Sequence, residues 1–196
     1  MDKTVKVDRR VLKTKRAIKE TFLNLMYEKG FESITIQQIL DGALINRSTF
    51  YAHYRDKYDL RDKIENELID GLADCAKTHA PATRGEAHID SVAIKTYLDA
   101  MLEYLVTNRE LVSHLLGPDG DPAFSLKIGR RTHEVWSEST LLEHLTLPEN
   151  YAFAGLSGMV SSILAEWARS GFRDKKEEVI EVLLSFLISI SKTMIK

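Results

Sequence analysis

Four consecutive polar residues, Asn46-Arg47-Ser48-Thr49, are the residues of this chain best suited to contact another molecule. Their side chains can bond to phosphate oxygens and base edges, and an arginine can pair with both acceptors of a guanine. Asn46 can also cap a helix that begins directly after it, and the free amides at a helix start attract anions. The run therefore indicates a nucleic-acid contact, although a capped core helix with a polar start explains the pattern equally well.

Two short motifs suggest catalysis, but each lacks an essential residue. In Gly155-Leu156-Ser157-Gly158-Met159, a methionine stands where a nucleophile elbow needs its second glycine. His133-Glu134 begins like a zinc-protease helix, but Ser137 replaces the second histidine. The six histidines show no ligand spacing. We therefore predict that the protein is not an enzyme, with no cofactor and no metal.

The charge is distributed unevenly along the 196 residues. Residues 1–57 hold 12 Lys/Arg against 7 Asp/Glu, whereas the remaining residues hold 15 against 22. A basic segment on an acidic body favours contact with a polyanion, and a solvated helix face is the plain alternative. A basic helix lying on a membrane is disfavoured, because the first helix lacks tryptophan and a broad apolar sector.

Several features favour a cytoplasmic location. Cys75 is the only cysteine, which excludes an intramolecular disulfide. The basic N-terminus is not followed by an apolar block, so we expect no secretory signal. Apolar runs stay below 18 residues, so we expect no membrane span.

Helical periodicity runs through the whole chain and predicts an all-α fold of about nine helices. Thr35 with Gln38 forms a capping-box pattern, Asp56 can cap the fourth helix, and Gly30 can end the first. The stretches that we assign by periodicity are 8–29, 36–42, a short helix after Asn46, 56–77, 90–107, 124–145, 148–170 and a last helix from about 174. The two short helices cannot be stable alone and need the first helix beneath them, which gives a helix-turn-helix head.

The region from about residue 10 to residue 62 resembles the DNA-binding signature of the TetR family. The matching positions are Thr35, Ile39, Ala43, Ile45, Thr49, Phe50, Tyr51, Tyr54, Lys57 and Leu60. The resemblance implies an N-terminal DNA-binding head (1–55), a connecting helix (56–79) and a larger C-terminal helical domain (80–196) for effector binding and dimerisation.

The turn between the two short helices departs from the family pattern. Leu44 replaces a glycine, Asn46 replaces a serine, and Ser48 replaces a second glycine. A leucine with positive φ costs about 1 kcal/mol or more, and we expect Gly42 to absorb part of that cost. The bases preferred by relatives therefore do not carry over.

Family roles imply a set of DNA contacts on this head. Phe50 and Ile45 are expected in the core, and His53 is expected to be buried or solvated rather than to read a base. The residues implied to contact bases or phosphates are Lys13, Thr35, Gln37, Asn46, Arg47, Ser48, Thr49, Tyr51, Tyr54 and Lys57.

Apolar stripes in the C-terminal half allow two interpretations each. The stripes of the last two predicted helices indicate a dimer interface or simply the chain's own core, namely Phe153, Val160, Ile163 and Trp167 on one and Val179, Leu183, Phe186 and Ile190 on the other. A second set indicates an effector pocket, with plain core as the more common explanation: Tyr97, Met101, Tyr104, His114, Trp136 and Met159.

The resemblance implies a sequence-specific transcription regulator. It would act as a homodimer on the double-stranded DNA of a palindromic operator, as a repressor released when an unknown small-molecule effector tilts the fourth helix. The head alone does not distinguish a repressor from an activator. The alternative is a helical coactivator, or a module that binds a protein or small molecule and has lost its DNA role.

Overall fold

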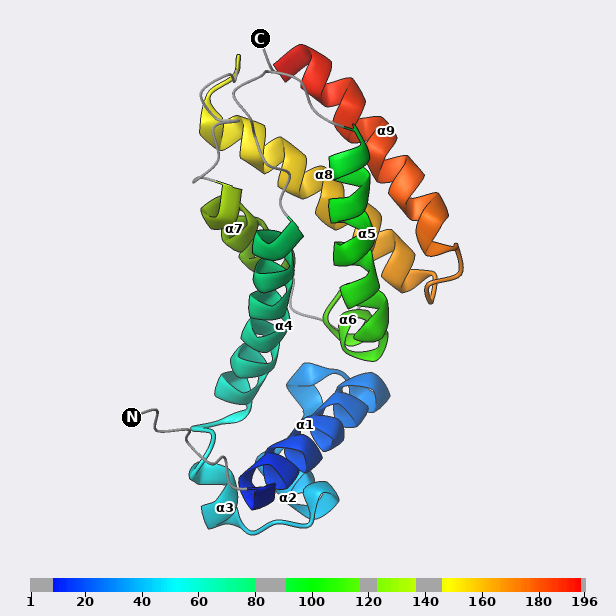
Figure 1. The fold of residues 1–196 in the computed structure, drawn as a ribbon. Helices are drawn as coiled ribbons and strands as arrows, with labels where there is room; N and C mark the ends of the chain where they lie inside the picture. The colour runs from blue at the N-terminus through cyan, green and yellow to red at the C-terminus, as the bar shows by residue number, and fades with distance from the viewer. Residues whose placement is uncertain (1–8, 80–90, 117–122, 137–145, 195–196) are drawn as a thin grey trace, which may run out of the picture. The chain divides into compact units, whose positions relative to one another are not determined.

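The computed structural model describes residues 9–79, 91–116, 123–136 and 146–194, and every regular element in them is helical (Figure 1). This confirms the all-α prediction. The elements are α1 (Arg9–Lys29), the 3-10 helix η1 (Phe31–Ser33), α2 (Ile36–Ala43), α3 (Arg47–Tyr51), α4 (Lys57–His79), α5 (Ser91–Thr107), α6 (Arg109–Leu116), α7 (Phe124–Trp136), α8 (Glu149–Arg169) and α9 (Lys176–Met194).

The chain divides into two compact units, Met1–Asn66 and Glu67–Lys196, and the division falls within α4. In the first unit, α1 packs against α2. Ile18, Phe22 and Met26 recur at four-residue spacing on α1 and are fully buried. Phe31 of η1 meets Phe22 edge-on, with ring centroids 6.1 Å apart. This core supports the two short helices, as expected from their length.

The predicted helix ends are confirmed by local hydrogen bonds. The Thr35 hydroxyl accepts from the Gln38 amide (3.4 Å), and the Gln38 side chain accepts from the Thr35 amide (3.1 Å), which completes the capping box. Asp56 Oδ1 accepts from the Asp59 amide (2.8 Å) at the start of α4. Gly30 has a φ of 72° and donates to the Met26 carbonyl at the end of α1.

Leu44 adopts the left-handed conformation in the turn between α2 and α3, with φ 53° and ψ 44°. The expectation that Gly42 absorbs part of this strain was wrong, because Gly42 lies inside α2. Gly42 instead lets α1 approach closely. A Cβ at this position would lie 2.5 Å from Thr21 Cγ2, and no side chain could occupy that space without a shift.

In the second unit, α5 packs along α9, and α8 contacts α6, α7 and α9 (Figure 1). Trp167 near the end of α8 is buried, stacks edge-on against Phe172 at 4.8 Å, and donates from Nε1 to the Asp174 carbonyl at 2.9 Å. These contacts hold the connection between α8 and α9. The short helix α6 was not among the helices assigned from periodicity, and residues 137–145 of the helix predicted at 124–145 lie outside the described residues.

Candidate nucleic-acid interface

The first turn of α3 is organised by one side-chain oxygen. Asn46 Oδ1 accepts from the Thr49 amide (2.8 Å), the Thr49 hydroxyl (2.8 Å) and the Ser48 hydroxyl (2.7 Å). A carbonyl oxygen has two lone pairs, so three donors compete for it and one hydroxyl can turn outward at little cost. Asn46, Arg47 and Ser48 are exposed and Thr49 is half-buried. The predicted cap is confirmed, and the helix presents polar groups to solvent.

Phe50 anchors this exposed turn to the core. Its side chain is fully buried and its ring lies 5.5 Å from that of Tyr51 and 5.6 Å from that of Tyr54. Tyr51 is half exposed, whereas Tyr54 is only 6% exposed. Core placement of Phe50 was predicted correctly. The burial of Tyr54 leaves little surface for its predicted phosphate contact.

The α2 surface next to α3 carries a chain of polar contacts that was not predicted. Arg47 Nη2 donates to Gln37 Oε1 at 3.3 Å, and Gln37 Nε2 donates to Asp41 Oδ1 at 2.8 Å. All three side chains are exposed, as is Thr35 at the start of α2. The spacing of Gln37 and Asp41, four residues apart on a predicted helix, is the sequence signal that could have indicated the second bond.

Lys57 is half-buried, and its ammonium is held by backbone carbonyls of the first unit. Its Nζ donates to the backbone carbonyls of Phe31 (3.1 Å) and Glu32 (2.9 Å) and lies 4.8 Å from the centre of the Phe31 ring. An ammonium has three donors, so these bonds leave one for any other acceptor. The geometry gives Lys57 a structural role that the sequence did not reveal, and its phosphate contact stays a prediction.

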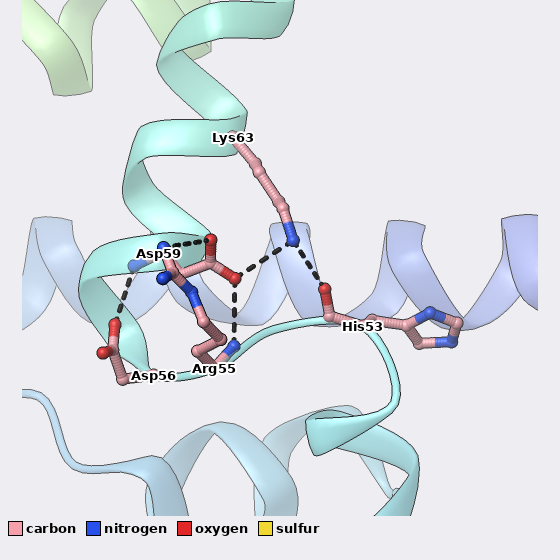
Figure 2. Close-up of polar contacts among 5 residues, drawn as sticks. All are labelled: His53, Arg55, Asp56, Asp59 and Lys63. Carbon is pink, nitrogen blue, oxygen red and sulfur yellow. Dashed lines mark hydrogen bonds and ion pairs between the residues drawn. The ribbon is translucent and has the colours of Figure 1, made fainter.

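The junction between α3 and α4 is held by a cluster of charged groups (Figure 2). Asp59 accepts from the Arg55 amide (2.9 Å) and from Lys63 Nζ (3.0 Å), and Lys63 also donates to the His53 carbonyl (2.8 Å). The bond from the Arg55 amide, followed by that from Lys63, lowers the pKa of Asp59. The His53 side chain is half-buried, as expected. The cluster fixes the end of the α3 segment against the start of α4.

Lys13 is exposed on α1 and borders a shallow groove. Ala43 and Ile45, on either side of the left-handed Leu44, line the same groove. Ile45 is half-buried and is not part of the buried core in which it was expected. The groove is open to solvent, so the Lys13 side chain is accessible for its predicted contact with the DNA backbone.

Among the described residues, no group of His, Cys, Asp or Glu is arranged to hold a metal ion. No described helix is long and apolar enough to cross a membrane.

The residues predicted to line a pocket have different surroundings in the second unit. Tyr97 is buried in a core cluster with Trp167 and Leu183, and Met101 packs against that cluster. Tyr104 instead faces α4, where a Cβ on Gly71 would lie 1.9 Å from its hydroxyl. Burial raises the pKa of this tyrosine. His114 and Met159 are half-buried, and the side chain of Trp136 lies outside the described part of the chain.

Three of the predicted interface residues belong to the chain's own core. Trp167, Val179 and Leu183 are buried, which corrects their assignment, because a side chain without exposed surface offers nothing to a partner. Phe186 is 49% exposed on α9, and Val182 on the preceding turn is also exposed. The remaining predicted residues are half-buried, namely Phe153, Val160, Ile163 and Ile190.

Comparison with known proteins identifies the first unit. Residues 20–64 match the model of the bacterial regulatory proteins of the tetR family. A TetR transcriptional regulator from Streptococcus agalactiae has a similar structure, with a TM-score of 0.61 and 25% identity over 91% of this chain and 96% of that one. Residues 20–64 therefore carry the DNA-binding region typical of TetR-family regulators.

Other similar proteins agree with this match to the TetR-family DNA-binding region. An uncharacterised HTH-type transcriptional regulator of Bacillus subtilis, YxbF, is 40% identical over 76 residues, a match that spans 36% of this chain and only 20% of that protein. NalD of Pseudomonas aeruginosa, the secondary repressor of the MexAB-OprM multidrug efflux pump, shares the fold with a TM-score of 0.68, at 15% identity over 96% of this chain and 99% of that one. The family match at 20–64 contains every predicted DNA contact except Lys13.

Proposed function

We propose that this TetR-family protein is a sequence-specific DNA-binding transcription regulator that acts as a homodimer on a palindromic operator. The observation that carries the proposal is the first turn of α3. Its polar side chains are exposed while Phe50 holds the helix on the core. A recognition helix needs this combination, because base edges are read by its N-terminal residues and rigid support fixes their direction.

The exposed residues divide by the chemistry that they offer. Arg47 carries a fork of donors suited to the two acceptors of guanine, and Asn46 has a side-chain amide nitrogen whose hydrogens can reach a base acceptor. Thr35 and Gln37 at the start of α2 and Tyr51 in α3 are also exposed and suit phosphate contacts. Lys13 would add a contact to the sugar-phosphate backbone.

Regulation by a small molecule is the second part of the proposal. α4 is a single helix that contributes to both compact units. A displacement of its second-unit part would therefore also move Asp59 and Lys63, which hold the end of the α3 segment. We propose that an effector bound in the second unit shifts α4 and releases the operator, so that the protein is a repressor in the cytoplasm.

Binding to DNA from the region upstream of the protein's own coding sequence tests the first part. Fluorescence anisotropy with a labelled duplex is expected to give a salt-dependent affinity, with a steep fall between low and physiological salt. Arg47→Ala is expected to reduce the difference in binding free energy between the preferred base and a wrong base by about 1–3 kcal/mol. Arg173→Ala, an exposed arginine in the second unit, serves as the matched control and is expected to bind normally.

The alternative is a helical coactivator, or a module that binds a protein or small molecule without a DNA role. It predicts that neither a promoter duplex nor a random duplex binds in a salt-dependent manner, and that Arg47→Ala has no effect. A reporter gene under the bound promoter then separates repression from activation, because deletion of a repressor raises expression and deletion of an activator lowers it.

A further inference from the structure

We infer that Asp41 is a positioning residue that determines the base preference of Arg47 by acting through Gln37. The inference rests on the proposed DNA-binding function and deepens it. Asp41 was not among the predicted DNA contacts. It is connected to Arg47 by two hydrogen bonds. Arg47 donates to Gln37 at 3.3 Å, and Gln37 donates to Asp41 at 2.8 Å.

The direction of the Gln37 amide follows from the groups at its two ends. A carboxylate only accepts hydrogen bonds, so the end facing Asp41 must be the amide nitrogen. A guanidinium only donates, so the end facing Arg47 must be the amide oxygen. Both neighbours therefore favour the same orientation of the Gln37 amide. The negative charge of Asp41 also polarises this amide, which makes its oxygen a stronger acceptor for Arg47. Arg47 is therefore held on the α2 side of the recognition surface before any DNA arrives.

The position of Asp41 is unfavourable for α2 itself. It lies in the last turn of the helix, where the partial negative charge of the helix dipole disfavours a carboxylate. Aspartate is also a poor former of helix interiors. On a surface proposed to face DNA, the same charge repels phosphate. Neither helix stability nor attraction to DNA accounts for an aspartate here, whereas the bond to Gln37 does.

A fixed arginine reads one base pair better than a mobile one, because less side-chain freedom is lost on binding. Asp41→Ala is expected to reduce the preference for the base read by Arg47 by about two- to tenfold, with other positions of the site unchanged. Its overall affinity for random DNA is expected to rise, because a repulsive charge is removed. Asp41→Asn removes the same charge and lets the Gln37 amide turn over, so it is expected to behave in the same way.

Selection from a random duplex pool, followed by affinity measurement with each base at each position, provides the test. Asp41→Glu keeps a carboxylate acceptor and is expected to retain most of the preference. In a Gln37→Ala background, the change in base preference on adding Asp41→Ala is expected to vanish, whereas the rise in affinity from the lost charge remains. Nuclear magnetic resonance of the Arg47 guanidinium in the free protein is expected to report greater mobility in Asp41→Ala.

The possible results separate the positioning role of Asp41 from the proposed DNA-binding function. If the wild-type protein enriches no duplex, the proposed DNA-binding function fails, and the inference fails with it. If the wild type enriches a site and Asp41→Ala reads that site with unchanged base preference, only the positioning role is overturned. An effect of Asp41→Ala that persists undiminished in the Gln37→Ala background would also overturn it, because Asp41 would then act through its charge alone.

Discussion

Leu44 combines two unfavourable features in the turn that leads into α3. Its φ of 53° places its Cβ close to backbone atoms, and 92% of its side chain is exposed, so no packing offsets the strain. Replacement by glycine is expected to stabilise the protein by about 1 kcal/mol, since glycine has no Cβ. For a chain of this length, that corresponds to a rise of about 2–4 °C in Tm, measurable by circular dichroism.

Leu44→Ala is the matched control for this prediction, because it removes the exposed apolar surface and keeps the Cβ. It is expected to melt close to the wild type. If Leu44→Ala and Leu44→Gly gave the same Tm, backbone strain would not be the cause.

Asp59 gives the junction of α3 and α4 a defined dependence on pH. Its pKa is lowered in the folded protein, first by the Arg55 amide and then by Lys63. The stability that it contributes is therefore present above its unfolded pKa of about 3.9 and is lost as the pH falls through the lower folded value. Asp59→Asn is expected to cost about 1 kcal/mol at pH 7, and the difference from the wild type is expected to shrink below pH 4.

Urea unfolding followed between pH 3 and pH 7 checks this prediction. Asp56→Asn changes the charge by the same amount, but asparagine caps a helix as well as aspartate does, so only a small loss is expected. A difference between Asp59→Asn and the wild type that stayed constant down to pH 3 would contradict a role for the ionised carboxylate.

Residues whose partners are close in sequence could be predicted, and those with distant partners could not. The caps at Thr35, Asn46 and Asp56 bond to groups three residues away, so their chemistry is visible in a short window. Lys57 bonds to carbonyls 25 and 26 residues away, which only the packed fold brings together. Arg47 and Gln37 are ten residues apart across a turn, so their contact was equally hidden.

At the scale of elements, the close approach of α1 and α2 depends on Gly42. Inside a helix, glycine to alanine usually gains up to about 1 kcal/mol. Here the new Cβ would lie 2.5 Å from Thr21 Cγ2, so the clash reverses the sign and Gly42→Ala is expected to destabilise the protein by about 1 kcal/mol or more. Chemical denaturation of the single variants and of the double variant measures the effect.

Thr21→Ser removes the methyl group that the new Cβ would meet. In that background Gly42→Ala is expected to lose most of its cost, or to stabilise the helix. A cost that is the same in both backgrounds would show that the approach of α1 is not what requires glycine.

Apolar periodicity correctly predicted the long helices, but it does not indicate what the apolar stripe of each helix contacts. On α9, the buried Leu183 lies in the same stripe as the exposed Phe186, and a spacing of three residues relates the two. The difference between a buried core and a free surface depends on which helices pack together, here α5 along α9, and this is a long-range property. The eight-residue helix α6 was missed for a related reason, since a short apolar pattern beside a longer helix carries little signal.

At the scale of the whole molecule, a palindromic operator requires two heads held at a fixed spacing. Recognition helices of a dimer contact half-sites one helical turn of DNA apart, about 34–36 Å. A single head that binds one half-site has a much lower affinity than two linked heads, because linkage makes the second contact intramolecular. Dimerisation through the second unit is therefore part of the proposed function, and the exposed apolar side chains of α9 are where we expect it.

Phe186→Glu is expected to convert a dimer into a monomer without unfolding the chain. The phenylalanine is 49% exposed, so a charge there stays solvated in the monomer but would be buried without a partner in an interface. Light scattering after size-exclusion chromatography is expected to report half the mass of the wild type, while the far-UV circular dichroism spectrum stays helical and operator affinity falls by about a hundredfold or more. Val92→Glu, at an exposed apolar residue of α5, is the matched control and is expected to stay dimeric. If Phe186→Glu remained a dimer with full operator affinity, the interface would have to use a surface other than this face of α9.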